Sequence, residues 1–120
     1  MTIQDMQQQV DAWISQFEEG YFSPSTMILR LAEELGELAR EVNHAFGEKP
    51  KKPTEPDGSV AMELGDMLFV LISFGNLLQL DLEQVFEMVM TKIRMRDQDR
   101  WTKKKSSELN APGTDDEKGG

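Results

Sequence analysis

Four stretches of the chain repeat apolar residues every three or four positions, which is the spacing of one face of an α-helix. Glycine and proline separate these stretches and end the helical pattern between them. The predicted helices cover about residues 2–18, 24–47, 59–78 and 82–101. We therefore expect an all-α fold, a bundle of four to five helices.

The starts of two helices carry characteristic capping residues. Ser23 precedes Pro24, and proline suits the first helical position because it has no N–H to lose there and its φ is already helical. Asp81 is followed three residues later by Gln84, the pattern of a capping box. These residues set the predicted beginnings of the second and fourth helices.

Residues 47–58, GEKPKKPTEPDG, form the predicted connection between the second and third helices. Three prolines and two glycines among charged residues cannot contribute to a core. At the end of this loop, Asp57 or Ser59 can cap the third helix. The lysines of the loop favour a solvated linker, although they could close over phosphate groups; they are Lys49, Lys51 and Lys52.

At 120 residues the chain is long enough for one domain. We expect that domain to span residues 1–103, because residues 104–120 have little apolar content and predict a disordered tail. A domain of this size buries only about two-thirds of the surface of its unfolded chain. We therefore expect a homodimer with a four-helix core built by the second and third helices, or a homotetramer.

Charge and composition exclude several classes of partner. The net charge of −9 disfavours nucleic acid and anionic membranes. The N-terminus lacks the basic and apolar runs of a secretory signal, and the longest apolar stretch, residues 67–80, is too short to span a bilayer of ~30 Å. Without cysteine, the chain can form neither disulfides nor thiolate zinc sites. We expect a cytoplasmic protein with no membrane or nucleic-acid partner.

Two pairs of carboxylates stand at helical spacing in the second and third predicted helices. The second helix contains Glu34 and Glu37, and the third contains Glu63 and Asp66. Residues three apart lie about 60° apart around a helix, so both members of a pair can reach one ion. Because we expect the two helices to pack together, we expect the four carboxylates to form one cluster.

Such a cluster is costly without a counter-charge. Two carboxylates ~5 Å apart repel by about 3 kcal/mol at an effective dielectric constant near 20. Protonation or a cation relieves this repulsion, and an all-oxygen ligand set favours Mg²⁺, Mn²⁺ or Ca²⁺ over zinc or copper. The cluster is therefore a predicted metal site. For Glu33 and Glu41 the alternative, a solvated helix face, stays open.

Two glycines stand inside these carboxylate pairs. Gly36 lies between Glu34 and Glu37, and Gly65 lies between Glu63 and Asp66. A helix interior favours alanine over glycine by about 1 kcal/mol. We expect both glycines to permit close approach of the helices.

The order of these motifs resembles the MazG family of all-α nucleoside triphosphate pyrophosphohydrolases, particularly its small YpjD-type members. The motifs are Glu-Glu-x-x-Glu at 33–37, a proline-rich loop, Glu-x-x-Asp at 63–66 and the apolar helix that follows. The resemblance covers about residues 25–101. It implies hydrolysis of (deoxy)nucleoside triphosphates to the monophosphate and pyrophosphate, a reaction suited to nucleotide-pool house-cleaning.

The resemblance also implies roles for individual residues. Mg²⁺, with Mn²⁺ as an alternative, would be held by the residues matching Glu34, Glu37, Glu63 and Asp66. Glu33 would act as a general base or as a partner of the metal ligands, which places it with Glu34 and Glu37 in the catalytic set. A metal ion between protein and triphosphate also explains how an acidic chain could bind an anionic substrate.

Members of this family use basic and polar residues of the last helix on the phosphates. Lys92, Arg96 and Arg100 are spaced four apart, so one positive stripe could take this role here. The family usually has an asparagine between the lysine and the arginine, whereas this chain has Asp97 after Arg96. The alternative is a basic helix end that interacts favourably with the helix dipole.

Four further residues have both a structural and a functional interpretation. Asn43 could reach the nucleobase and is included among the substrate contacts, whereas His44 is expected to be satisfied at the end of its helix. Trp13 and Phe17 could stack on a base, but their spacing favours the core.

Two other function classes fit part of the sequence. A carboxylate-bridged di-iron bundle needs Glu-x-x-His on two helices, and this chain has one histidine. A non-catalytic helical module that binds a nucleotide or a protein partner would suit the apolar third helix. Such a module would leave the acidic cluster unexplained, so we favour the enzyme.

Overall fold

Helices account for the regular secondary structure of the described part of the chain, which in this computed structural model comprises residues 1–47, 53 and 58–105. They are α1 (Ile3–Ser15), α2 (Pro24–Phe46), α3 (Val60–Leu77) and α4 (Leu82–Asp97). The all-α prediction is confirmed. The chain divides into two compact units, residues 1–86 and 87–120, so α4 begins in the first unit and ends in the second.

Local capping residues determine where the helices begin. The Thr2 hydroxyl accepts a hydrogen bond from the Asp5 N–H (3.0 Å), and the Asp5 carboxylate accepts one from the Thr2 N–H (2.9 Å). This complete capping box is not among the predicted helix starts. Ser23 and Ser59 cap α2 and α3 by accepting from the backbone N–H three residues later, at 3.3 and 2.9 Å. Both serine caps are confirmed, and Asp57 lies outside the described residues.

The first helix is shorter than its apolar pattern suggests. α1 ends at Ser15, and two turns follow, in which Phe17 donates to the Ile14 carbonyl and Gly20 to the Phe17 carbonyl, each at 3.2 Å. Gly20 has a φ of +62°, a left-handed conformation that glycine adopts without steric cost. The expected extension to residue 18 was therefore wrong.

The fourth helix begins as predicted but ends early. The Asp81 carboxylate accepts hydrogen bonds from the N–H groups of Glu83 (3.0 Å) and Gln84 (3.5 Å), as a helix cap does. α4 ends at Asp97, whose carbonyl accepts from the Arg100 N–H (3.0 Å) in a turn. Arg100 therefore lies beyond the helix, and the single helical stripe expected to carry it does not extend that far.

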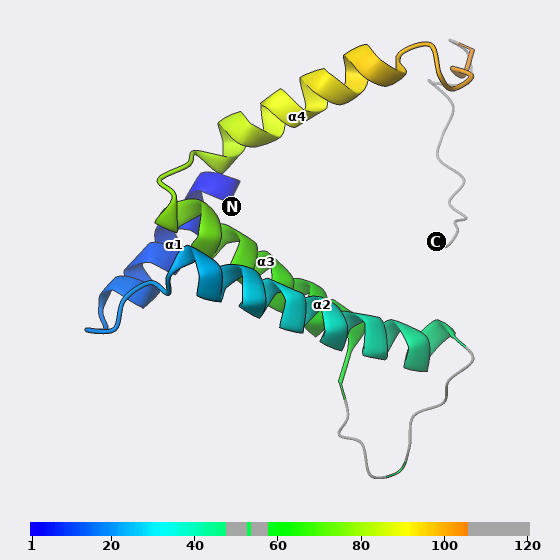
Figure 1. The fold of residues 1–120 in the computed structure, drawn as a ribbon. Coiled ribbons are helices and arrows are strands. Elements are labelled where there is room, and N and C mark those ends of the chain that lie inside the picture. The colour runs from blue at the N-terminus through cyan, green and yellow to red at the C-terminus, as the bar shows by residue number, and fades with distance from the viewer. Residues whose placement is uncertain (48–52, 54–57, 106–120) are drawn as a thin grey trace. The chain divides into compact units, whose positions relative to one another are not determined.

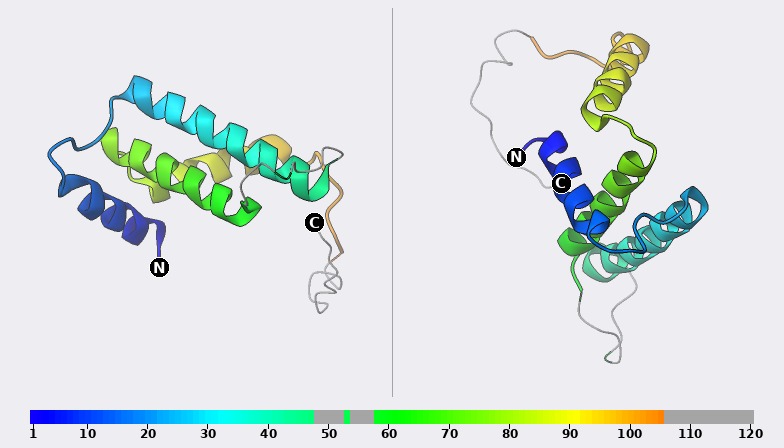
Figure 2. Two further views of the ribbon diagram at one scale, coloured as in Figure 1. Left: turned by 90° about the horizontal axis from the view of Figure 1, so that it is seen from below. Right: turned by 90° about the vertical axis from the view of Figure 1, so that its left-hand side faces the viewer.

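Within the first unit, α2 and α3 run antiparallel and side by side, and α1 packs against α3 (Figures 1 and 2). The buried apolar side chains of the described residues come from these three helices; they are Val10, Met27, Val70 and Ile72. This is a small core for three helices. On α2 it lies near the start of the helix, and on α3 it lies in the second half.

A polar network ties α1 to the end of α3. The Gln7 side chain donates to the Asn76 side chain (2.9 Å) and to the Leu80 carbonyl (2.8 Å), and it accepts from the Leu82 N–H (3.0 Å). Asn76 donates in return to the Gln7 carbonyl (2.9 Å) and to the Tyr21 hydroxyl (3.1 Å). Each of these amides is thus bonded through both its donor and its acceptor.

The expectation that α3 lies inside a core holds for one side of the helix only. Val70 and Ile72 are buried, whereas Leu64, Leu68 and Leu71 are 53%, 42% and 45% exposed. On α2, residues spaced by seven are also exposed. We call these two sets the exposed apolar stripes; they are Ile28, Leu35 and Val42 on α2, and Leu64, Leu68 and Leu71 on α3.

α3 is also apolar enough to compare with membrane helices. It has 18 residues with a mean hydropathy of 1.5, so by length and composition alone it could cross a membrane. It begins seven residues before the apolar stretch 67–80, which is why it reaches this length. Core helices of soluble proteins meet the same criteria, so this feature is compatible with either environment.

The glycines that allow close packing are not the ones expected. A Cβ atom added at Gly36 or Gly65 would meet no atom within 4 Å, so the predicted close approach at these positions is wrong within the described chain. A Cβ at Gly75 would instead lie 2.9 Å from the Leu82 side chain. Gly75 therefore permits the tight turn of the chain from α3 into α4.

Candidate metal centre

Three glutamates from two helices converge beside one another. Glu34 and Glu37 lie one turn apart on α2, and Glu63 lies in the first turn of α3. Because the two helices run antiparallel, the middle of α2 lies beside the start of α3. Each glutamate offers one carboxylate oxygen to a group of atoms that all lie within 4.8 Å of one another. This spacing is suited to one shared cation.

Burial makes two of these carboxylates unusual. Glu34 and Glu63 are half-buried, and the Oε2 atom of each is buried without a hydrogen-bond partner among the described residues. A buried carboxylate oxygen without a partner costs free energy, because it has lost water and gained nothing in return. Glu37, the third member of the group, is exposed.

The electrostatics of the cluster favour protonation when no cation is present. Burial raises the pKa of Glu34 above its ordinary value, and the charges of Glu37, Asp66 and Glu33 raise it further, against a smaller opposing effect of Arg30. Burial likewise raises the pKa of Glu63. The charges of its three acidic neighbours and a hydrogen bond with Glu37 act in the same direction.

The other predicted acids lie around this group. Asp66 raises the pKa of both Glu34 and Glu63 through its charge, so it is near them, but it is not among the three residues within 4.8 Å. Glu33 is exposed and acts on Glu34 in the same way. Three of the four predicted metal ligands are thus brought together, and the fourth stands beside them.

The donor set fits a hard divalent cation. Carboxylate oxygens are the ligands that Mg²⁺ and Mn²⁺ prefer. A divalent ion would also give the unpartnered oxygens of Glu34 and Glu63 a partner and would remove the repulsion within the cluster. The residues present could therefore hold such an ion.

Glu41 does not lie on a solvated helix face, so that interpretation of its position is wrong. It is only 7% exposed, and it forms an ion pair with Arg40, with 3.7 Å between Nε and Oε2. A Cβ at Gly58 would lie 2.6 Å from its Oε2, so the carboxylate rests against the chain just before α3. The sequence held no signal for this contact, because it joins residues on either side of the loop.

The predicted substrate contacts lie in three places. Asn43 is exposed on α2, six residues beyond Glu37, and its amide donates to the Ala39 carbonyl (3.0 Å). Lys92 and Arg96 are exposed on the part of α4 that belongs to the second unit. The lysines of the loop, Lys49, Lys51 and Lys52, lie outside the described residues.

Asp97 bonds to two of the arginines that are predicted to contact phosphate, Arg96 and Arg100. Its carboxylate accepts from the Arg96 guanidinium (3.0 Å) and from Arg100 (3.4 Å). The hydrogen bond from Arg96 holds the pKa of Asp97 below its ordinary value. Asp97 therefore orients both arginines, a role not assigned to it from the sequence.

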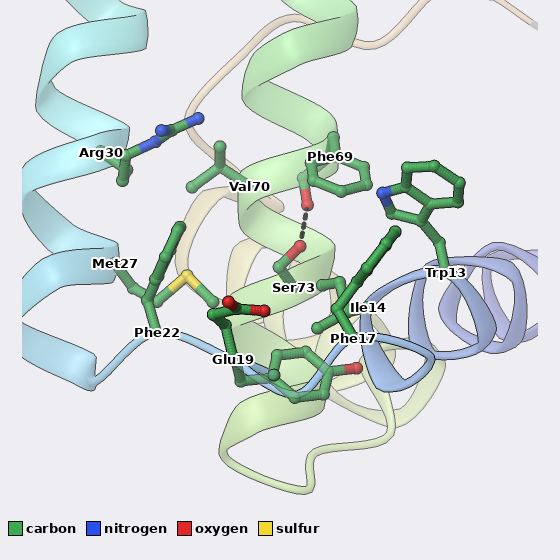
Figure 3. A pocket seen from close by; sticks show the side chains of 12 residues that line it. Trp13, Ile14, Phe17, Glu19, Phe22, Met27, Arg30, Phe69, Val70 and Ser73 are labelled. Carbon is green, nitrogen blue, oxygen red and sulfur yellow. Dashed lines mark hydrogen bonds between the residues drawn. The ribbon is translucent and has the colours of Figure 1, made fainter.

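An aromatic pocket lies farther along the same helix pair, where Arg30 on α2 and Val70 on α3 line it. It has a volume of about 350 Å³ and is bounded by α1, the turn after it, the start of α2 and the middle of α3 (Figure 3). Trp13 and Phe17, which were expected in the core, are 58% and 47% exposed there, with ring centroids 5.1 Å apart in an edge-to-face arrangement. The core assignment of these two rings was therefore wrong.

Comparison with known proteins identifies similar chains. Residues 22–101 match the family model described as the MazG nucleotide pyrophosphohydrolase domain. The uncharacterized protein YpjD of Bacillus subtilis (strain 168) is 58% identical over 103 residues, which cover 86% of this chain and 93% of that protein.

Two solved structures are also similar. The crystal structure of YpjD from Bacillus subtilis has a TM-score of 0.70 at 58% identity, covering 77% of this chain and 94% of the other. The structure described as the Bacillus-conserved MazG protein, a nucleotide pyrophosphohydrolase, has a TM-score of 0.70 at 53% identity, covering 83% and 97%. The family match spans both helices that carry the acidic cluster, α2 and α3.

Proposed function

Because the chain belongs to the MazG nucleotide pyrophosphohydrolase family, we propose that it hydrolyses (deoxy)nucleoside triphosphates to the monophosphate and pyrophosphate. The proposed cofactor is Mg²⁺, which Mn²⁺ could replace. The observation that carries this proposal is the cluster of Glu34, Glu37 and Glu63, with two buried oxygens that lack a partner. A chain of this charge needs a cation between its acidic site and an anionic substrate.

We assign the metal to the three clustered glutamates and to Asp66 beside them. When bound, Mg²⁺ would neutralise phosphate charge and polarise the attacking water. Glu33 is exposed next to Glu34, and its carboxylate would accept the proton that the water loses. The water oxygen forms a new P–O bond as the bond between the monophosphate and pyrophosphate parts breaks.

Basic and polar side chains would hold the substrate. Lys92, Arg96 and Arg100 would donate hydrogen bonds to phosphate oxygens, with Asp97 fixing the direction of the two arginines. Asn43 would contact the nucleoside end from α2. A cytoplasmic enzyme of this kind would remove unwanted nucleotides from the precursor pool.

We also propose that the working form is a homodimer, or a homotetramer built from two dimers. The exposed apolar stripes of α2 and α3 are evidence for this, since an isolated chain would leave them in water. Pairing these helices with those of a second copy gives a four-helix core.

The deciding experiment measures pyrophosphate and free phosphate released from a panel of canonical and modified nucleoside triphosphates, with and without Mg²⁺. We expect pyrophosphate and no equivalent release of free phosphate, only when the metal is present. Tight nucleotide binding without turnover of any substrate would contradict the enzyme and favour the alternative, a non-catalytic nucleotide-binding module.

A further inference from the structure

Glu41 occupies an unusual place for an acidic residue of α2. It is only 7% exposed, and a Cβ atom at Gly58 would lie 2.6 Å from its Oε2 and 2.8 Å from its Cδ, so the carboxylate rests against the chain just before α3. Acidic side chains are seldom buried to this degree, because burial removes the water around the charge. The proposed reaction gives this residue no role and does not explain its contact with the start of α3.

The contact between Glu41 and Gly58 continues the pairing of the acidic site. α2 and α3 run antiparallel, so residues that face each other step in opposite directions along the chain (Figure 1). Glu37 meets Glu63 in the cluster. Four residues farther along α2, Glu41 meets the chain five residues before Glu63. Four residues of helix rise about 6 Å, so the Glu41 contact lies about one turn from the cluster.

Hydrogen bonds in the first turn of α3 connect this contact to Glu63. Ser59 follows Gly58 and caps the helix. Its hydroxyl accepts from the Met62 N–H (2.9 Å), and its carbonyl accepts from the Glu63 N–H (3.1 Å). The backbone of Glu63 is thus fixed relative to the residue next to Gly58. A movement of Gly58 away from Glu41 would therefore move Glu63 as well.

The acidic cluster lies between the Glu41 contact and the apolar core. On these two helices, the buried apolar side chains of the described residues are Met27 near the start of α2, and Val70 and Ile72 in the second half of α3. Repulsion among the clustered carboxylates acts to separate the helices between these two places. The carboxylate of Glu41 also lies by the N-terminus of α3, whose partial positive charge attracts it. This contact therefore opposes the separation on the side of the cluster away from the core.

We propose that Glu41 is a positioning residue of the metal centre: it holds the start of α3 against α2 and so keeps Glu63 within reach of the cation bound by the glutamates of α2. This inference rests on the proposed function for the cation. Glu41 is not among the three residues whose oxygens converge, so its role differs from that of a ligand. Gly58 leaves the space that the carboxylate of Glu41 occupies.

The test measures metal binding, so it does not depend on turnover. Mn²⁺ alone is the probe, and electron paramagnetic resonance measures how much of it stays free when the full-length, metal-free protein is added. We expect Glu41→Ala to raise the dissociation constant by about 10- to 100-fold, as losing a partner outside the ligand shell does. Glu41→Gln keeps the size of the side chain, so it should lose much less. Glu18→Gln removes the same charge from an exposed position and should bind like the parent.

Three outcomes of this measurement would overturn the inference. Equal losses in Glu41→Ala and Glu41→Gln would make Glu41 a direct ligand. Unchanged Mn²⁺ affinity in Glu41→Ala together with a lower melting temperature of the metal-free protein would make its role purely structural. A parent that binds no Mn²⁺ would remove the metal centre, and with it any residue that positions the ligands.

Gly58→Ala tests the same contact from α3 and does not require Glu41→Ala to fold. The φ of Gly58 lies outside the left-handed region, so alanine fits the backbone, but its Cβ would displace the Glu41 carboxylate. We expect Gly58→Ala to weaken Mn²⁺ binding in the parent and to cause no further loss when it is added to Glu41→Ala, because the contact is already gone. Additive losses, or parent-like binding by Gly58→Ala, would contradict a role for this contact.

These outcomes separate the inference from the proposed function. The expected Mn²⁺ affinities without pyrophosphate release from any nucleotide would remove the enzyme and keep the positioning role of Glu41. Pyrophosphate release by the parent, with parent-like Mn²⁺ binding in Glu41→Ala and Gly58→Ala, would keep the enzyme and remove the positioning role.

Discussion

At the scale of single residues, the acidic site is defined by what its carboxylates lack. Glu34 and Glu63 each bury one oxygen with no partner among the residues described, and their like-charged neighbours add repulsion. A structural ion pair would have provided a cation, as Arg96 does for Asp97 in the second unit. The difference between these two environments is the physical reason to treat the cluster as a ligand site.

Substitution of Glu37 tests the metal assignment. Glu37→Gln keeps the size of the side chain but removes the charge, so we expect pyrophosphate release to fall by more than the roughly 10- to 100-fold typical of losing an outer-shell partner. Because Glu37 is exposed, the melting temperature in the absence of metal should not fall. Glu18→Gln, an exposed acid far from the cluster in sequence, is the matched control. Full activity of Glu37→Gln would contradict the assignment.

The raised pKa values of Glu34 and Glu63 make a prediction about pH. In metal-free protein, the folded state holds these protons more tightly than the unfolded state, whose pKa is near the ordinary value of 4.5. Stability should therefore fall as the pH rises from about 4.5 through the raised pKa values, and recover as the pH is lowered again. Urea denaturation in EDTA across this range measures the effect.

The control for this pH effect is the double variant Glu34→Gln and Glu63→Gln. It carries no titratable group at either position, so its stability should depend less steeply on pH over the same range. An equal slope in the parent and the double variant would show that the effect arises elsewhere.

At the scale of elements, the junction of α3 and α4 depends on one glycine. Gly75 is buried, and its missing side chain leaves the space that the Leu82 side chain occupies. Gln7 reinforces the junction by bonding to the Leu80 carbonyl and the Leu82 N–H. The start of α4 is thus fastened to α1 as well as to α3.

Gly75→Ala should destabilise the protein although alanine is the better helix former. The added Cβ would lie 2.9 Å from the Leu82 side chain, so that side chain must move, at a cost of about 1–3 kcal/mol against a propensity gain of about 1. Chemical denaturation measures the free energy of unfolding. In the background of Leu82→Ala, where the crowding atoms are gone, Gly75→Ala should be neutral or stabilising. The same loss in both backgrounds would exclude Leu82 as the cause.

At the scale of the whole molecule, apolar residues exceed the space that the first unit provides to bury them. Its three packed helices bury four apolar side chains, while the exposed apolar stripes repeat along two of the same helices. Stripes at helical spacing are what a second helix pair would cover. The exposed apolar stripes are therefore the surface that the proposed dimer would bury.

Leu68→Asp should weaken the proposed dimer. Leu68 is 42% exposed and central in its stripe, so a buried charge there would oppose association, while the isolated unit should tolerate it. Sedimentation velocity should show a shift toward the monomer at concentrations where the parent is dimeric. Ser25→Asp adds the same charge at an exposed polar position and serves as the control. A monomeric parent would refute the dimer outright.

Magnesium should stabilise the whole fold. An ion that binds the folded cluster and not the unfolded chain raises stability by mass action, by about 2.7 kcal/mol at 100 times its dissociation constant. Thermal unfolding with increasing Mg²⁺ should show a rising melting temperature in the parent and a smaller rise in Glu37→Gln. A melting temperature indifferent to Mg²⁺ would count against the site.

The sequence by itself determined the presence of the four helices, most of their starts and the carboxylate pairs that are candidate metal ligands. Periodicity, proline and capping residues act within a few positions along the chain, so the caps Ser23 and Asp81 follow from the sequence alone, and the cap of the third helix is narrowed to Asp57 or Ser59. The pairs at 34 and 37 and at 63 and 66 follow from the same local geometry.

The tertiary structure decided which residues meet. It placed Glu63 closer than Asp66 to the α2 pair, buried Glu41, opened Trp13 and Phe17 to a pocket, and gave the close approach to Gly75 rather than to Gly36 or Gly65. These outcomes depend on the rotation and offset of one helix against another. Such offsets arise from the combined packing of the whole unit, and no short stretch of sequence encodes them.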